Sequence, residues 1–192
     1  MMTRGIACFL PALAVVLMLF AQPAAAQDAG AKAREIDSLF TGLCLAYLGD
    51  GNKIVEQAAA IGAKPLPKII ATQFLAPRKG VAWAVQGASG LYMLGLNDQQ
   101  SCRVIGPDAG AVETLHAFAS GPKRRKVGEE LVNDRVQHVY AVVVTDAQSQ
   151  QEKQVVVIAT VSPDVATPGI FLDALPYGIA KQAGIVIEDW PQ

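Results

Sequence analysis

Apolar residues recur with a helical period near the N-terminus and with a strand period from Gly80 onward. The first stripe has spacings of 3, 1, 3, 1 and 3 residues and consists of Ile36, Leu39, Phe40, Leu43, Cys44 and Tyr47. This pattern predicts an amphipathic helix with its apolar side buried. Asn52 can cap a second helix, which Gly62 ends. Residues 27–32, which precede both helices, are expected to form a short flexible leader.

A period of two predicts strands in the middle of the chain. Residues 81–86 alternate between large apolar and smaller or polar side chains, and residues 91–96 follow after a short glycine-containing connection. These two segments are expected to form a hairpin in which Trp83 and Tyr92 belong to the core. A third strand is expected over residues 101–105.

A helix and further strands are expected in the second half of the chain. Asp108 can cap the helix, and β-branched runs then predict strands over residues 126–132, 136–145 and 154–161. Prolines and glycines after Pro163 predict an irregular C-terminal segment, with room for one edge strand at its end, over Ile185-Val186-Ile187.

The order of these elements predicts an α+β fold for residues 27–192, taken as a single soluble domain. We expect a mainly antiparallel sheet with helices packed on one face and a helical pair at the N-terminus. A length of 192 residues fits one domain. The formal net charge is only −1, with 16 basic and 17 acidic residues, so a general attraction to nucleic acid is not expected.

The N-terminus has the three parts of a secretory signal. Arg4 supplies a positive charge, an apolar run extends to Phe20, and small residues follow up to Ala26. We therefore predict a signal peptide over residues 1–26, cleaved between Ala26 and Gln27, and export to the periplasm or beyond. The apolar run is shorter than the about 20 residues of a membrane span, so the mature form is not expected to cross a membrane.

Two cysteines, Cys44 and Cys102, remain once Cys8 leaves with the signal peptide. An oxidising compartment favours a disulfide between them, which would join the first helix to the third strand. The alternative is two separate buried thiols, because unpaired cysteine behaves as a small hydrophobic residue.

Concentrated positive charge occurs in one run, Lys123, Arg124, Arg125 and Lys126. Two interpretations are open. The run is either a solvated connection between helix and strand, or a contact for an acidic envelope protein or an anionic polymer.

Residues with catalytic or ligand-binding chemistry are sparse. Glu113 and His116 have the i, i+3 spacing of a helical metal ligand pair, but the pair occurs once and on a chain that does not predict a helical bundle. His138 falls in a predicted strand, and Ser89 lacks the nucleophile-elbow motif. Phosphate-binding glycine motifs are absent from the sequence. We therefore predict neither a metal nor a cofactor.

Three short motifs resemble a family of small exported bacterial proteins and lipoproteins of unknown function. They are Phe40-x-x-x-Cys44, Gly80-Val81-Ala82-Trp83 and Ser101-Cys102-Arg103-Val104. The resemblance implies an envelope location and the Cys44–Cys102 bridge. It implies no activity.

These observations favour a non-catalytic binding or accessory role in the cell envelope. The alternative is an envelope hydrolase with a site assembled from scattered residues such as Ser89, His116 or His138, which requires a histidine within hydrogen-bond reach of a serine or carboxylate in a cleft. A structural component of a larger assembly would instead expose a large apolar patch.

Overall fold

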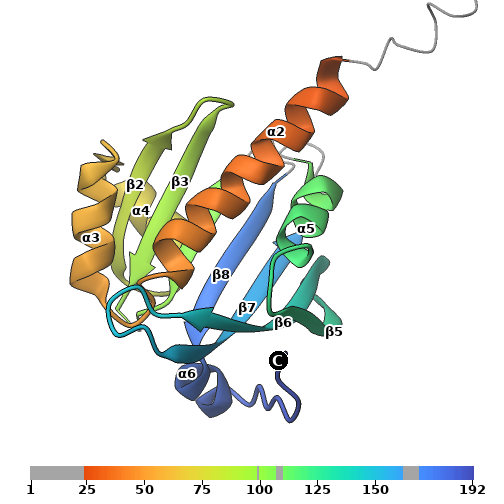
Figure 1. Cartoon of the computed structure of the whole chain (residues 1–192). Coiled ribbons are helices and arrows are strands. Elements are labelled where there is room, and N and C mark those ends of the chain that lie inside the picture. The colour runs from red at the N-terminus through yellow and green to blue at the C-terminus, as the bar shows by residue number, and fades with distance from the viewer. Residues whose placement is uncertain (1–23, 99, 107–109, 162–168) are drawn as a thin grey trace, which may run out of the picture.

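A computed structural model describes residues 24–98, 100–106, 110–161 and 169–192 of the chain (Figure 1). Its centre is one eight-stranded sheet in which every neighbouring pair of strands is antiparallel. The strands are β1 (Lys64–Pro65), β2 (Gly80–Gln86), β3 (Leu91–Asn97), β4 (Cys102–Gly106), β5 (Arg124–Val132), β6 (Arg135–Thr145), β7 (Glu152–Val161) and β8 (Ile170–Pro176). Their order across the sheet is β1-β2-β3-β4-β8-β7-β6-β5. The predicted α+β class is therefore confirmed.

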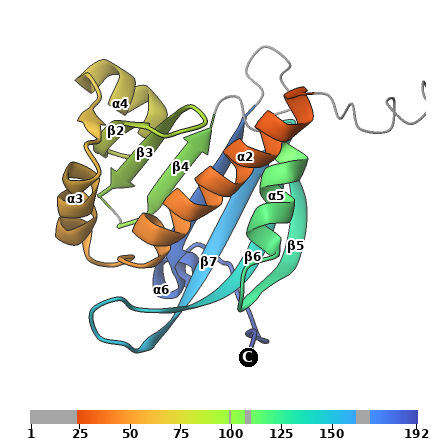
Figure 2. The ribbon, with the colours of Figure 1, turned by 45° about the horizontal axis from the view of Figure 1, so that its top comes forward.

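A layer of helices covers one face of the sheet, which we call the first face (Figures 1 and 2). Its helices are α2 (Ala24–Leu39), the π-helix η1 (Phe40–Leu45) that continues it, α3 (Gly51–Ala60) and α5 (Ala111–Ala119). The leader expected over residues 27–32 is thus wrong, because these residues belong to α2. Asp50, and not Asn52, caps α3 by accepting a hydrogen bond from the Lys53 amide. The Asp108 cap predicted for α5 lies outside the described residues.

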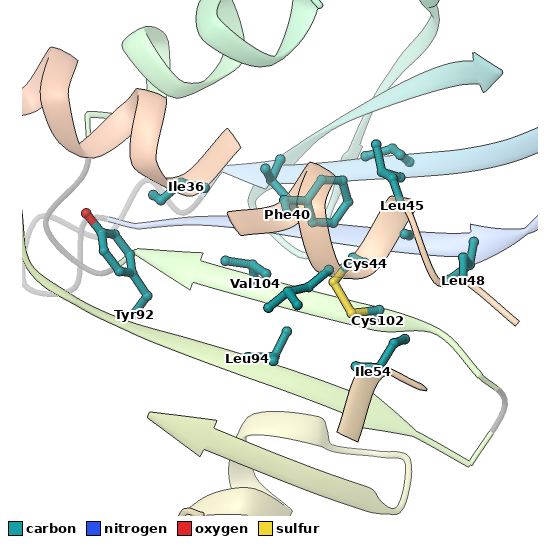
Figure 3. Close-up of a cluster of buried hydrophobic side chains, with 14 of the residues drawn as sticks. Ile36, Phe40, Cys44, Leu45, Leu48, Ile54, Tyr92, Leu94, Cys102 and Val104 are labelled. Atoms are coloured by element: carbon teal, nitrogen blue, oxygen red, sulfur yellow. A yellow bond between two sulfur atoms is a disulfide. The ribbon is translucent and has the colours of Figure 1, made fainter. Parts of the chain in front are cut away.

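The main core lies between this layer and alternate side chains of the sheet (Figure 3). Labelled members of this cluster are Ile36, Phe40, Cys44, Leu45, Leu48, Ile54, Tyr92, Leu94, Cys102 and Val104. Trp83 belongs to it together with Tyr92, as the core interpretation predicted. Within the cluster, Cys44 of η1 and Cys102 of β4 form a disulfide with a Cα–Cα distance of 5.3 Å. The pairing expected from the sequence therefore joins the helical layer to the middle of the sheet.

The opposite face of the sheet, the second face, is also covered, so the prediction of helices on one face was incomplete. Helix α4 (Lys68–Leu75) packs over β2, β3 and β4 through Ala71, Phe74 and Leu75. It approaches β3 closely at Gly95, where a Cβ atom would lie 2.7 Å from Phe74 and Leu75. The sequence interpretation missed α4 because extended backbone was expected at Pro65 and Pro67, and the helix begins directly after Pro67.

The C-terminal segment, expected to be irregular, contains β8 and the helix α6 (Tyr177–Gln182). Strand β8 lies between β4 and β7 and is therefore central. Helix α6 and the residues after it pack on the second face over β6, β7 and β8, where Ala180 and Ile187 are buried. The edge strand considered at residues 185–187 is absent, since these residues lie outside the strands of the structure.

The signal peptide predicted over residues 1–26 lies almost entirely outside the described residues, and the cleavage pair Ala26 and Gln27 falls in the first turn of α2. Within the described ranges, none of the helices is both long enough and apolar enough to cross a membrane.

Candidate functional site

A polar cleft opens on the second face between the apolar cluster under α4 and the apolar cluster under α6. Its volume is about 200 Å³. The lining residues are Leu75, Ala76, Pro77, Arg78, Asn97, Ser101, Arg103, Gln137, Ile158, Thr160, Asp173 and Leu175. We call this set the polar cleft. Ligand sites are typically concave and combine an apolar wall with a few placed polar groups, so this cleft is the candidate site.

An ion pair across two central strands forms the floor of the polar cleft. Arg103 on β4 lies directly opposite Asp173 on β8 in the sheet register. Its Nε donates to Oδ1 of Asp173 at 2.6 Å and its Nη2 donates to Oδ2 at 3.1 Å, which makes the pair bidentate. The remaining Nη1 donates to the carbonyl of Phe74 at 2.9 Å. All three nitrogens of the Arg103 guanidinium are therefore engaged.

Two aromatic rings hold the Arg103 guanidinium in place. It lies 5.9 Å from the ring centre of Phe74 and 5.5 Å from that of Phe171. Both distances are within the range of a cation–π contact. The rings come from α4 and β8, so the position of Arg103 depends on the cover of the second face as well as on the sheet.

Burial dominates the electrostatics of Asp173. It raises the pKa of the Asp173 carboxyl above its ordinary value, although the charges of Arg103 and Arg78 act in the opposite direction. An ion pair taken out of water costs a large desolvation energy, which apolar residues would avoid. A charge pair on central strands, beside a cleft, is for that reason a functional-site candidate rather than a device for stability.

Arg78 is the second cation of the polar cleft. It lies three residues beyond the end of α4, and its amide donates to the Leu75 carbonyl. Its Nη1 atom is buried and has no hydrogen-bond partner in the described part of the chain. The buried hydroxyl residues Ser101 and Thr160 line the same space. The polar cleft thus holds two guanidinium groups, one carboxylate that is already paired, and neutral polar groups.

This arrangement suits the binding of an anion. The formal charges of Arg78, Arg103 and Asp173 add to +1, and the buried Nη1 of Arg78 has no hydrogen-bond partner among the described residues. A buried donor without a partner costs about 1–3 kcal/mol, which a bound acceptor would recover. Neither histidine of the chain lines the cleft, so the acid–base pairs that use an imidazole are not formed there.

The basic run is divided among separate ion pairs. Lys123 binds Glu152 at 2.5 Å and Lys126 binds Glu129. Arg125 lies within 4.0 Å of the Asp189 carboxylate.

Arg124, the remaining member of the run, is buried, with 4% of its side chain exposed. It contacts Asp37 of α2 at 2.6 Å and lies 4.3 Å from the centre of the Phe118 ring. Arg124 therefore joins β5 to the helical layer, and the four cations do not form one uncompensated patch.

The histidines and Ser89 lie on separate elements. His138 on β6 places Nδ1 3.0 Å from Oε2 of Glu129, and its pKa is lowered by burial and by Lys126, although Glu129 raises it. His116 and Glu113 both line a groove between α2 and α5. The hydrogen bonds of the described residues join neither imidazole to a serine. His138 lies within hydrogen-bond reach of the Glu129 carboxylate, but neither of these two residues lines the polar cleft or the groove between α2 and α5. In the same described ranges, there is no group of three or more His, Cys, Asp or Glu residues that could hold a metal ion.

Ser89 has a structural contact instead. The Glu35 carboxylate of α2 accepts hydrogen bonds from the Ala88 amide at 2.6 Å, the Ser89 amide at 2.8 Å and the Tyr92 hydroxyl at 2.7 Å. Burial raises the pKa of the Glu35 carboxyl, but the three hydrogen-bond donors outweigh it and the net pKa is lowered. Glu35 therefore ties the β2–β3 turn to α2.

The substitution Glu35→Gln is expected to reduce the stability of the fold by about 1 kcal/mol at neutral pH, because it removes a charge-assisted acceptor. A carboxyl with a lowered pKa in the folded state stabilises the protein above its unfolded pKa, and this contribution is lost as the pH falls through the folded pKa. Urea denaturation of both proteins between neutral and acid pH measures the difference. The difference in unfolding free energy between the two proteins should shrink below about pH 4.5. A difference that stays constant with pH would contradict the assignment.

Comparisons of this chain with protein-family models, with curated proteins and with solved structures found no match. The sequence analysis assigned no site role to Arg78, Arg103, Thr160 or Asp173. A signal was present at Arg103, which is a charged residue inside a predicted strand whose neighbours are apolar. Its partner was not evident, because Asp173 is 70 residues away and lies in the segment expected to be irregular.

Proposed function

We propose that this chain is an exported, non-catalytic binding domain of the cell envelope whose polar cleft holds the carboxylate group of its ligand. The observation that carries the proposal is the buried Nη1 of Arg78, which has no partner among the described residues and lies beside the Arg103–Asp173 pair. The export part of the proposal is supported by the signal pattern of residues 1–26.

A carboxylate fits the polar cleft for two reasons. A guanidinium group presents N–H donors in a planar fork that matches the two oxygens of a carboxylate. The volume of about 200 Å³ is small, so the ligand is a short organic acid or the carboxylate end of a larger molecule. Arg103 is already saturated by Asp173 and Phe74, which leaves Arg78 to make the direct contact.

The test uses the exported protein with two probes, succinate for a free acid and a tripeptide with a free C-terminus for a presented carboxylate. Isothermal titration calorimetry is expected to detect binding of at least one probe. Arg78→Gln should weaken this binding by about tenfold or more, since a hydrogen bond to a charged group is worth about 1.5–3 kcal/mol. Lys79→Gln is the matched control, because it removes an adjacent exposed cation that is not needed for the site.

The outcome of the titration decides the proposal. Binding that is lost in Arg78→Gln and kept in Lys79→Gln supports it, and the probe that binds identifies the form of the carboxylate. Equal binding by both variants would place the anion elsewhere on the surface. Failure of both probes to bind the wild-type protein would remove the support for a carboxylate ligand.

A further inference from the structure

The outer strand β5 has one free edge. It pairs with β6 on one side, and no other strand of the described residues pairs with it on the other side. Apolar side chains are exposed along it, with Leu131 71% and Val127 39% accessible. The opposite edge of the sheet differs, because β1 has only two residues and one of them, Pro65, has no amide hydrogen. A long strand available for pairing therefore exists at β5.

The backbone groups that point to the free edge follow from the β5–β6 hairpin. Its loop consists of Asn133 and Asp134, with φ angles of 50° and 61°, which fits a type I′ turn closed by a hydrogen-bonded pair. Hydrogen-bonded and non-hydrogen-bonded pairs then alternate along the strands. The residues that direct N–H and C=O groups away from β6 are Arg124, Lys126, Glu129 and Leu131. The amide of Val143 donates to the carbonyl of Lys123, which agrees with this alternation.

The charges of β5 are arranged in two halves of opposite sign. Arg125 and Lys126 precede a bulge at Val127, and Glu129 and Glu130 follow it. An antiparallel copy of the same strand reverses the order, so that Lys126 faces Glu129 of the copy and Arg125 faces Glu130 of the copy. Within one chain Lys126 contacts Glu129 and Arg125 contacts Asp189, so the copy brings a second carboxylate to each cation. Opposite charges at facing positions stabilise a strand pair, whereas like charges destabilise it. Charged edges normally discourage pairing with a foreign strand, but this order favours pairing with itself.

The bulge makes this register geometrically consistent. In a regular strand, residues three apart point to opposite faces, so Lys126 and Glu129 could not face each other around a twofold axis. The extra residue at Val127 shifts the alternation, and both side chains lie on the first face, opposite Tyr140 and His138 of β6. Both residues also direct their backbone groups outward. In the register that pairs Lys126 with Glu129 of the copy, the facing residues therefore share a face of the sheet, direct their backbone groups toward each other and carry opposite charges.

We infer that two copies of this chain pair through β5 in antiparallel orientation, with Lys126 of each copy facing Glu129 of the other and Arg125 facing Glu130. The contact is isologous, as in most homodimers, and it extends the sheet across both copies. It uses the free edge of β5, and none of the residues of β5 lines the polar cleft.

The test is the oligomeric state of the exported protein and of two charge-reversal variants, measured by sedimentation velocity. The wild-type protein is expected to be a dimer at about 100 µM, a concentration that detects dissociation constants up to that order. Arg125→Glu and Glu130→Arg each place like charges at two facing positions, and each should raise the dissociation constant by about tenfold or more. Both residues are exposed, so folding is expected to be retained and is checked by circular dichroism.

Mixing the two variants provides the decisive measurement. In a mixed dimer, the glutamate introduced at position 125 of one variant faces the arginine introduced at position 130 of the other. The unchanged Glu130 of the first variant then faces the unchanged Arg125 of the second, so the mixture should dimerise more tightly than either variant alone. Lys64→Glu reverses an exposed charge on β1, at the opposite edge of the sheet, and should leave the dimer intact. A monomeric wild type, single variants with the dissociation constant of the wild type, or a mixture that dimerises no more tightly than the single variants would each overturn the inference.

Discussion

Replacing both Cys44 and Cys102 by alanine is expected to lower the free energy of unfolding by about 4 kcal/mol. The disulfide closes a chain separation of 58 residues, and the loss of that constraint increases the entropy of the unfolded state. Both cysteines are fully buried between η1 and β4, so alanine at these positions also removes part of the core (Figure 3). Guanidinium denaturation of the oxidised wild type and of the double variant measures the loss.

Reduction provides the control for this prediction. A reducing agent should shift the denaturation midpoint of the wild type toward that of the double variant and leave the double variant unchanged. Intact mass of the purified protein, before and after reduction, reports the two hydrogens that the bridge removes, and the same spectrum shows whether the chain begins at Gln27. A wild-type midpoint that does not respond to reduction would contradict the bridge.

The substitution Asp173→Leu is expected to cost about 3 kcal/mol or more, because it leaves the Arg103 guanidinium without its carboxylate in a poorly hydrated cleft. The side chains of Arg103 and Asp173 are only 28% and 14% exposed. The second substitution, Arg103→Met, removes the guanidinium charge that Asp173→Leu leaves unpaired. The double variant should therefore be less destabilised than the sum of the two single variants, which a double-mutant cycle measures as a coupling energy.

The exposed pair Lys53 and Glu56 on α3 is the matched control for this cycle. Their side chains are 28% and 64% exposed, and exposed ion pairs contribute little. The coupling between Lys53→Ala and Glu56→Ala should accordingly be much smaller than that between the residues of the polar cleft. Equal coupling in the two cycles would mean that burial does not distinguish the cleft pair, and it would weaken the case for a functional site there.

Stability and binding should separate in the polar cleft. Asp173 and Arg103 hold each other, and Arg103 also contacts the ring of Phe74, whereas Arg78 has an atom without a partner among the described residues. We therefore expect substitutions at Arg103 and Asp173 to affect folding first, and substitutions at Arg78 to affect the anion first. This difference distinguishes Arg103 and Asp173, which hold the cleft in its folded form, from Arg78, which contacts the ligand.

Local pattern determined several elements without the structure. The helical stripe around Cys44 and the alternation in residues 81–86 and 136–145 depend only on which side chains are buried, and a period of 3.6 or 2 reports that directly. Both predicted hairpins, β2–β3 and β6–β7, are present as antiparallel pairs, because their short connections leave the strands adjacent. For the cysteines, the sequence left a disulfide and two separate buried thiols as alternatives, and the structure forms the disulfide.

Tertiary structure decided what those elements pack against. The place of β8 between β4 and β7 depends on pairing partners far away in the chain, and the prolines and glycines around it concealed a central strand. The same pairing brings Asp173 to Arg103 across 70 residues and creates the polar cleft. Periodicity identifies the side of an element that is buried, but the identity of its neighbours depends on long-range register. The amphipathic elements were therefore determined by the sequence, whereas the candidate site required the folded sheet.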